Sequence, residues 1–348
     1  MHRIIGERDL ADTPFGEDLA RELYRDMVLA RRFDERAVAL QRRGWMSSYP
    51  PFRGQEASQV GAASALTADD WLFPTYRSNA MQIARGVPMS DILRFRRGYP
   101  EFESEHDLPT FPQTIPIASQ IPQAAGVGMA MNYTDDDGAV LSYFGDGATS
   151  EGDFHEGLNF AGVFDAPVVF FCENNGWAIS QPRSQQTASH TIADKANAYG
   201  FQGGQVDGND PLAVHEIVVT ALAKARNEEP VLIESLTYRQ GAHTTSDDPS
   251  RYRDREGDLP DWRTRDPLER YEEYLREQDV ADDEFVEAVN ENADEKLDRA
   301  VDRAESAAQS SPADLFESVY GSLSDRLQHQ KEDLETLAAD HDLQELEH

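Results

Sequence analysis

Apolar residues along the chain follow two patterns, short continuous runs and segments with helical spacing. Two apolar runs, residues 139–144 and 168–172, enclose a segment in which Phe154, Leu158 and Ala161 recur at i, i+4 and i+7. That spacing puts the three side chains on one face of a helix, which can pack on a sheet. Strand, helix and strand in so short a segment predict a parallel crossover unit.

The same alternation continues on both sides of this unit. Further helices are predicted in residues 17–43, 56–66, 122–133, 193–199 and 211–227, and further strands in residues 71–76, 203–206 and 231–238. Strands that alternate with helices are typical of parallel sheets. We therefore expect an α/β fold with a doubly wound, largely parallel sheet and helices on both faces.

Segments outside the α/β region carry a different pattern. Residues 1–16 are polar and predict a mobile arm, and the amphipathic helix after them has a charged face that includes Arg31, Arg32 and Arg36. We expect that face to be solvated or to meet another subunit. Residues 266–337 are acidic and helical in pattern, so their apolar stripes predict packing on the core or on a partner.

Three regions follow from these patterns. They are an N-terminal arm and helix in residues 1–43, an α/β core in residues 44–260, and a C-terminal helical extension in residues 261–348.

Composition limits the possible partners. The chain has 348 residues with 39% hydrophobic content, enough for a large core, and 65 acidic against 32 basic residues give a net charge of −33. Nucleic acid and anionic membrane surfaces are poor partners for such a field. Only four residues are lysine. An acidic surface poor in lysine suits a cytosol at molar salt, where self-repulsion is screened, so we expect an extreme halophile; the alternative is an acidic mesophilic protein.

The single cysteine and the absence of long apolar runs indicate the compartment. Cys172 lies in an apolar run, so we expect a buried, inert thiol and no internal disulfide, in keeping with a reducing cytosol. The first residues lack the apolar region of a signal peptide, and no run approaches the roughly 18 apolar residues of a membrane span. We expect a cytoplasmic protein.

Chemistry is predicted where the first strand of the crossover unit ends. Gly145-Asp146-Gly147 lies there, at the sheet edge where open α/β sheets bind ligands. Glycine lets the backbone approach a ligand, and the amides of Gly147 and Ala148 can hold a phosphate. The Asp146 carboxylate would repel that phosphate unless Mg2+ lies between them. Asn174-Asn175, at the end of the next strand, offers further oxygen ligands.

Each of these motifs has an ordinary structural explanation. Gly-Asp-Gly alone or Asn-Asn alone is usually a turn, and their combination with strand, helix and strand is what favours a diphosphate and Mg2+ site. Tyr76-Arg77 follows another strand, and an Arg fork can bind phosphate oxygens, although a surface Arg explains it equally well. His243 lies in a polar loop after a buried strand; such a histidine is commonly a surface residue, but imidazole can also donate hydrogen bonds or move protons.

Gly-Asp-Gly followed at this interval by Asn-Asn is the thiamine diphosphate signature. The chain resembles the alpha subunit of the thiamine diphosphate-dependent, decarboxylating first component of 2-oxoacid dehydrogenase complexes, of the pyruvate and branched-chain type, over about residues 20–330. The segments that carry the resemblance are FPTYR, IPIASQIPQAAGVG, GDGATSEGDFHEGLNFAG, ENNGWAIS, QVDGNDPLAV and YRQGAHTTSDDPSRYR. The third and fifth are closer to bacterial pyruvate-type subunits, whereas TSDD is closer to branched-chain enzymes.

The resemblance implies a thiamine diphosphate-binding fold and a set of site residues. Asp146, Asn175 and the Trp177 carbonyl would hold Mg2+, His243 and Arg239 would be catalytic, and the cofactor would be bound by Tyr76, Arg77, Ile117, Asp146, Gly147, Ala148, Asn175 and His243. Ile117 matches the apolar wedge beneath the cofactor, and His243 would orient the reacting intermediate. Thr114, Ser119 and Gln120 match a loop that binds K+ in some members, although a proline-rich turn explains them as well.

The implied reaction is oxidative decarboxylation of a 2-oxo acid, most simply pyruvate, with transfer of the acyl group to a lipoyl domain of the second component. A branched-chain 2-oxoacid or acetoin dehydrogenase alpha subunit is one alternative, and a non-catalytic subunit that binds Mg2+ and diphosphate for assembly is another. The family's cofactor-activating glutamate belongs to a separate beta subunit, and this chain has no second α/β half to supply it. The resemblance therefore implies an obligate heterotetramer.

Overall fold

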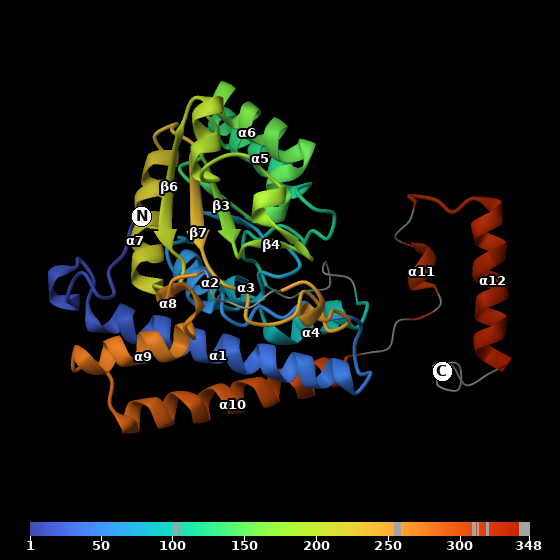
Figure 1. Cartoon of the computed structure of the whole chain (residues 1–348). Helices are drawn as coiled ribbons and strands as arrows, with labels where there is room; N and C mark the ends of the chain where they lie inside the picture. Colours follow the sequence, from blue (N-terminus) through green and yellow to red (C-terminus); the bar gives the residue numbers. More distant parts are fainter. Residues whose placement is uncertain are drawn as a thin grey trace. The chain divides into compact units, whose positions relative to one another are not determined.

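The computed structural model describes residues 1–99, 104, 106–253, 259–307, 311, 313–317 and 320–340. These residues belong to two units, Met1–Ala304 and a C-terminal unit that begins at Glu305. The first unit contains the sheet and the helices around it (Figure 1). In the second unit the described helices are α11 (Asp314–Glu317) and α12 (Asp325–Asp340).

A five-stranded parallel sheet forms the centre of the first unit. Its order is β1 (Trp71–Phe73), β2 (Val140–Gly145), β3 (Val168–Asn174), β7 (Val231–Leu236) and β6 (Gln202–Asp207). A separate two-stranded antiparallel ribbon pairs β4 (Trp177–Ala178) with β5 (Gln181–Pro182). The predicted crossover unit is confirmed, because β2 and β3 pair in parallel with Val140 opposite Val168. Every residue of β3 is buried, as expected of a central strand covered on both faces.

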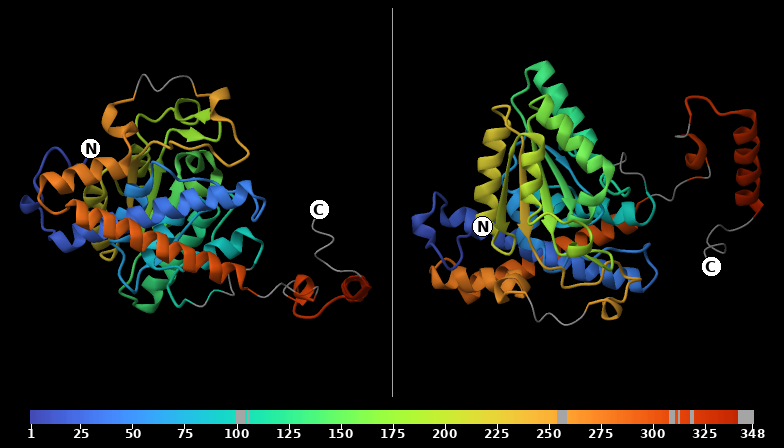
Figure 2. Two further views of the ribbon diagram at one scale, coloured as in Figure 1. Left: turned by 90° about the horizontal axis from the view of Figure 1, so that it is seen from below. Right: turned by 45° about the horizontal axis from the view of Figure 1, so that its top comes forward.

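Helices cover both faces of the sheet, as predicted (Figures 1 and 2). On one face α2 (Glu56–Ala63) and α7 (Pro211–Ala225) belong to a core that includes Val169 and Phe171 of β3. On the other face α5 (Gln120–Thr134) and α6 (Gly152–Val163) surround Phe170 and Cys172. Successive side chains of β3 therefore enter two separate cores, which explains its continuous apolar run.

The remaining elements surround this centre. They are the helices α1 (Glu17–Arg42), α3 (Asn79–Arg85), α4 (Met89–Arg96), α8 (Asp261–Thr264), α9 (Pro267–Glu277) and α10 (Asp283–Glu305), and the 3₁₀ helices η1 (Leu10–Asp12), η3 (Asp146–Ser150), η4 (Arg183–Gln185), η5 (Ala193–Tyr199) and η6 (Pro249–Arg251). Segment 193–199 is thus a 3₁₀ helix rather than an α-helix. The first strand ends at Phe73 and not at residue 76, because Pro74 has no N–H to continue the ladder.

The prediction of a mobile arm at the N-terminus is wrong, because the first residues are docked on the sheet. His2 forms a parallel bridge with Val206 at the end of β6. The backbone N–H groups of Ile4 and Ile5 each donate to Asp210 at 2.7 Å, and the Ile4 side chain is fully buried. The acceptor lies more than 200 residues away, so the local polar pattern carries no sign of it.

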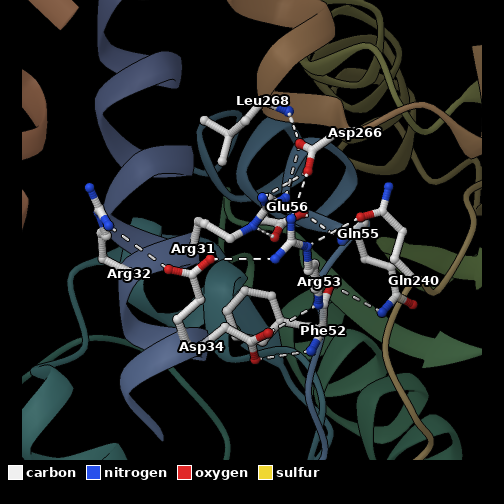
Figure 3. A network of polar contacts seen from close by, with 12 residues as sticks. Arg31, Arg32, Asp34, Phe52, Arg53, Gln55, Glu56, Gln240, Asp266 and Leu268 are labelled. Carbon is white, nitrogen blue, oxygen red and sulfur yellow. Dashed lines mark hydrogen bonds and ion pairs between the residues drawn. The ribbon is translucent and has the colours of Figure 1, made fainter. Parts of the chain in front are cut away.

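Arg31 also departs from its prediction, because it is buried. Its guanidinium donates to Glu56 at 2.6 Å and to Asp266 at 2.9 and 3.1 Å, which ties α1 to the start of α2 and to the N-cap of α9 (Figure 3). Arg32 and Arg36 remain partly exposed and contact Asn290 and Asp298 of α10. Among the described residues, no helix is both long enough and apolar enough to cross a membrane.

Candidate active site

A cavity of about 500 Å³ lies at the carboxyl edge of the sheet. It is lined by residues that follow β1, β2, β3 and β7, because parallel strands all end at the same edge. Every site residue selected from the sequence lines it: Tyr76, Arg77, Ile117, Asp146, Gly147, Ala148, Asn175, Trp177, Arg239 and His243. Tyr76 and His243, the most distant of them, are 167 positions apart in the sequence. Strand order brings the residues at the strand ends together, and the turn before α5 adds Ile117.

Asp146 supplies an unpaired carboxylate oxygen inside this cavity. The residue is only 1% exposed, Oδ2 accepts a long bond of 3.4 Å from Gln186, and Oδ1 has no hydrogen-bond partner within the described part of the chain. Burial raises the pKa of the carboxyl to about 6, although its own backbone N–H and the charge of Arg239 act in the opposite direction. A buried oxygen without a partner is costly unless a cation or a donor satisfies it.

Asn175, at the end of the neighbouring strand, is held at both ends of its side-chain amide. Nδ2 donates to Gln55 Oε1 at 2.9 Å, and Oδ1 accepts from the Trp177 N–H at 3.2 Å. The Asp146 carboxylate, the Asn175 amide oxygen and the Trp177 carbonyl are all hard oxygen donors, the type that Mg2+ prefers. The described residues contain no group of three His, Cys, Asp or Glu side chains suited to a metal. A metal ion would therefore need amide, carbonyl or phosphate oxygens as well.

Gly147 is required by close packing. A Cβ at this position would lie 2.9 Å from the Cβ of Ala178 in β4, so a side chain could be accommodated only by moving that strand. The amides of Gly147 and Ala148 belong to η3, and α6 begins only after an extended Glu151. Gly-Asp-Gly therefore does not open the crossover helix directly, because a turn of 3₁₀ helix precedes α6.

His243 is held between two arginines. Its Nδ1 lies 3.0 Å from Arg77 Nη2 and 3.1 Å from Arg239 Nη1. Because guanidinium groups can only donate, Nδ1 must accept, which leaves the proton of the neutral ring on Nε2. Burial and then the charges of Arg77 and Arg239 lower the pKa of His243 to about 3. The imidazole is consequently a neutral hydrogen-bond donor through Nε2 at physiological pH.

The two arginines are themselves fixed. Arg77 also donates to the Pro51 carbonyl at 2.6 Å and to the His243 carbonyl at 2.8 Å. Arg239 is almost fully buried, and burial, with the nearby charge of Arg77, lowers its pKa to about 10. Two cations in one cavity wall are an unfavourable arrangement without an anion, which makes this wall suited to phosphate or carboxylate groups.

The loop that carries His243 is ordered by an acidic anchor. Asp247 accepts from the His243 backbone N–H at 2.7 Å and from the Tyr252 hydroxyl at 2.5 Å. Burial would raise the pKa of Asp247, but these bonds and the neighbouring Arg239 outweigh it and lower the pKa. Arg253 donates to the Gly241 carbonyl, which closes the loop. The residues that follow, 254–258, lie outside the described residues.

The proline-rich turn before α5 supplies the apolar part of the cavity. Ile117 is 45% exposed and lines it, as an apolar wedge would. Of the residues matched to a K+ loop, Thr114 and Gln120 line the cavity. The hydroxyl of Ser119 instead donates to the Pro116 carbonyl at 3.0 Å, and the Gln120 amide donates to the Tyr143 carbonyl at 2.8 Å. Tyr76 packs edge-on against His243 with ring centroids 6.3 Å apart.

Sequence analysis missed two residues of the site, Glu173, which lines the cavity, and Gln55, which contacts the lining residue Asn175. Glu173 lines the cavity, is 1% exposed and accepts from the Tyr143 hydroxyl and from Gln59 at 3.2 Å; burial raises its pKa to about 7. A charged residue directly after the apolar run of β3 was the signal that could have identified it. Gln55 has no comparable signal, because its contact with Asn175 joins residues that are 120 positions apart.

The chain is similar in sequence to known proteins over most of its length. The family model described as "Dehydrogenase E1 component" matches residues 24–313. The chain is 42% identical over 325 residues to the 3-methyl-2-oxobutanoate dehydrogenase subunit alpha of Mycobacterium tuberculosis, which covers 91% of this chain and 87% of that relative. It is 39% identical over 319 residues to the pyruvate dehydrogenase E1 component subunit alpha of Bacillus cereus, with 91% and 86% covered. The subunit of the same name in Bacillus subtilis is 38% identical over 332 residues, with 94% and 89% covered.

Proposed function

The chain belongs to the dehydrogenase E1 component family, and from this premise we propose that it is the alpha subunit of a 2-oxoacid dehydrogenase first component. With thiamine diphosphate and Mg2+, the complete component would decarboxylate a 2-oxo acid and transfer the acyl group to a lipoyl domain of the second component. The observation that carries the proposal is the single cavity in which the unpaired Asp146 oxygen, two arginines and a neutral His243 meet.

Binding of the cofactor would use the two polar walls of the cavity. Asp146, Asn175 and the Trp177 carbonyl would hold Mg2+, and the amides of Gly147 and Ala148 would face the diphosphate together with Tyr76 and Arg77. Ile117 would support the rings. Bound thiamine diphosphate supplies the electron sink for the electron pair that remains when CO2 leaves.

His243 would act as a neutral hydrogen-bond donor and not as a protonated imidazolium acid. Arg77 and Arg239 occupy Nδ1, so the neutral ring keeps its proton on Nε2 and can donate it in a hydrogen bond to an oxygen of the reacting group. The same contacts hold the ring in one orientation. Arg239, beside His243, would also neutralise negative charge on the reacting group.

A partner subunit completes the proposal. Ile115, Ile117 and Ile179 line the cavity and are between 45% and 57% exposed in this chain. Apolar side chains grouped at a site entrance favour cover by another protein surface. A beta subunit that covers them would also supply the carboxylate that activates the cofactor, so we propose a heterotetramer.

Pyruvate is the substrate that we propose, and a branched-chain 2-oxo acid is the second candidate. Relatives of both names match the chain at about 40% identity, which supports the reaction more strongly than either acid. The 65 acidic residues against 32 basic ones, the four lysines and the single buried cysteine support a further proposal, that the enzyme works in the cytoplasm of an extreme halophile.

The test is decarboxylation by this chain co-expressed with a candidate beta subunit, in molar KCl with Mg2+ and thiamine diphosphate. Pyruvate and 3-methyl-2-oxobutanoate are followed by CO2 release, and acetoin, which has no carboxylate to lose, is followed by acetaldehyde release. An artificial electron acceptor is present in each assay to oxidise the remaining acyl unit. We expect turnover that needs both chains and that is lost in Asp146→Ala. Full activity of the isolated chain would refute the heterotetramer. A folded complex that binds the cofactor but converts none of the substrates would instead indicate an assembly subunit.

A further inference from the structure

We propose that Gln55 is a positioning residue for the metal site, because it holds the Asn175 amide in the orientation that keeps Oδ1 available to a divalent cation. The inference rests on the proposed function, in which Asn175 is a ligand. Gln55 does not line the cavity and has no ligand role of its own. It acts only through the contact of 2.9 Å between Asn175 Nδ2 and Gln55 Oε1.

The hydrogen-bond partners of an asparagine side chain determine which way its amide faces. Rotation by 180° exchanges the oxygen and the NH2 group with almost no change in shape. Only the oxygen can bind a cation, so the wrong orientation would turn two N–H bonds toward the metal. The side chains of Gln55 and Asn175 are 0% and 6% exposed, so two mismatched groups at their contact would leave buried polar atoms unpaired, which is costly.

A backbone carbonyl determines the orientation through Gln55. Gln55 Nε2 donates to the Phe52 carbonyl at 3.3 Å, and a carbonyl oxygen can only accept. The Gln55 Oε1 therefore faces Asn175 and accepts a hydrogen bond, and Asn175 donates it from Nδ2. Its Oδ1 then lies on the opposite side of the amide, where the Trp177 N–H donates to it at 3.2 Å. The contact with Gln55 is the shorter of the two, and both require the same orientation.

Gln55 can orient the Asn175 amide because hydrogen bonds and close packing hold its own loop in place. The backbone N–H of Gln55 donates to the Phe52 carbonyl at 3.0 Å, and the Gly54 N–H donates to Glu56 at 2.8 Å. Gly54 has a φ of +90°, and a Cβ there would lie 2.4 Å from the Tyr238 carbonyl, so the loop is pressed against the segment that follows β7.

Glu56 links this loop to the buried Arg31 and through it to Asp266, as Figure 3 shows beside Gln55 and Gln240. Helices α1 and α9 therefore brace the residue that orients the metal ligand. A side chain whose rotamer is held from several directions is what a supporting contact to a metal ligand requires.

The experiment measures divalent-cation affinity and not activity. Mn2+ replaces Mg2+ in the complex of this chain with its beta subunit at a fixed, saturating concentration of thiamine diphosphate, and unbound Mn2+ is counted by electron paramagnetic resonance. Gln55→Leu, which keeps the volume but removes both hydrogen bonds, is expected to weaken Mn2+ binding by about 10- to 100-fold, the usual loss when the partner of a ligand is removed. Gln55→Met is expected to give the same loss and serves if Gln55→Leu does not assemble.

The control separates positioning from general damage. Gln82 is an equally buried glutamine whose amide donates to the Ser78 carbonyl and makes no bond to Asn175, so Gln82→Leu is expected to bind Mn2+ as the wild type does. A double-mutant cycle adds the specific readout: in an Asn175→Ala background the effect of Gln55→Leu should disappear, because its route to the metal is gone.

Two results would overturn the inference: Mn2+ affinity of Gln55→Leu within twofold of the wild type, or the full loss persisting when Asn175 is alanine. Failure of the wild-type complex to bind Mn2+ with thiamine diphosphate would be a different result, since it would refute the proposed function itself.

Discussion

Replacing Arg31 by methionine is expected to destabilise the first unit strongly, although Arg31 is remote from the cavity. The guanidinium makes ion pairs with Glu56 at 2.6 Å and Asp266 at 2.9 Å. The side chains of Arg31 and Glu56 are 10% and 0% exposed. Burial alone would lower the pKa of Arg31, but the charges of Glu56 and Asp266 outweigh it and raise the pKa. Glu56 and Asp266 thus stabilise the charged form of Arg31, and Arg31 compensates their negative charges.

The expected magnitude follows from what the substitution leaves behind. Without Arg31, the Glu56 carboxylate stays buried with the Gly54 N–H as its one remaining donor within the described residues. Removing one partner of a buried ion pair costs about 3–5 kcal/mol, because the other charge is left uncompensated. Unfolding entropy of about 2.1 cal/mol/K per residue means that a unit spanning Met1–Ala304 melts about 1.6 °C lower for each kcal/mol lost, so a decrease of about 5–8 °C is expected.

The assay is thermal unfolding followed by circular dichroism in molar KCl, with Arg36→Met as the matched control. Arg36 lies on the same helix and meets Asp298 at 2.8 Å, but these side chains are 38% and 63% exposed. An exposed pair contributes at most about 1 kcal/mol, and concentrated salt screens it further. Each substitution removes an ion pair at nearly the same distance, but the pair of Arg31 with Glu56 is buried and that of Arg36 with Asp298 is exposed. Arg31 also loses its second partner, Asp266.

Equal melting temperatures for Arg31→Met and Arg36→Met would refute the reasoning. A second check is the double variant Arg31→Met with Glu56→Gln, which removes the uncompensated charge. It should be more stable than Arg31→Met alone, because the cost arises from the orphaned carboxylate rather than from lost packing.

Three further predictions concern the cavity and the core. The pKa of His243 is about 3 in the folded protein and about 6.5 in the unfolded chain, so the unfolded state takes up a proton first as the pH falls. Stability should therefore decrease from about pH 6.5 toward pH 3. The melting temperature of His243→Asn should depend less on pH, and an unchanged slope would contradict this. Gly147→Ala should lower the free energy of unfolding by about 1–3 kcal/mol, because the new Cβ meets Ala178. Adding Ala178→Gly should restore the wild-type melting temperature. A wild-type melting temperature for Gly147→Ala alone would exclude the clash. Burial raises the pKa of the Cys172 thiol, so iodoacetamide should modify it only after unfolding, and rapid modification of the native protein would show that the thiol is accessible.

Local patterns were sufficient for the parts of the fold that local sequence controls. The apolar run of β3 has no polar residue before Glu173, and a strand buried on both faces is the simplest explanation of such a run. The crossover from β2 to β3 follows, because parallel strands need a connection of this kind. The grouping of Asp146 and Asn175 was predictable for the same reason: both follow adjacent parallel strands, so they must meet at one edge.

Other features depend on partners that are distant in the sequence. The polar arm at the N-terminus is docked because Asp210 accepts from Ile4 and Ile5, and no property of residues 1–16 indicates that acceptor. Arg31 looks like any other arginine on the charged face of a helix, and its burial results from Glu56 and Asp266, the latter 235 positions away. Charge patterns along one helix therefore do not distinguish a solvated arginine from a buried one.

The same distinction applies inside the candidate site. Which residues reach the cavity is determined by strand order, whereas how each one is oriented depends on contacts with other elements. His243 is neutral because Arg77, from the segment after β1, and Arg239, four residues before it on its own segment, both donate to Nδ1. Asn175 has its amide orientation because Gln55 is held by a loop before α2. Protonation state and amide orientation are the properties on which the proposed chemistry depends. They can be assigned only when the surrounding donors and acceptors are known, since the donor or acceptor placed against each atom, and not the identity of the residue, decides its role.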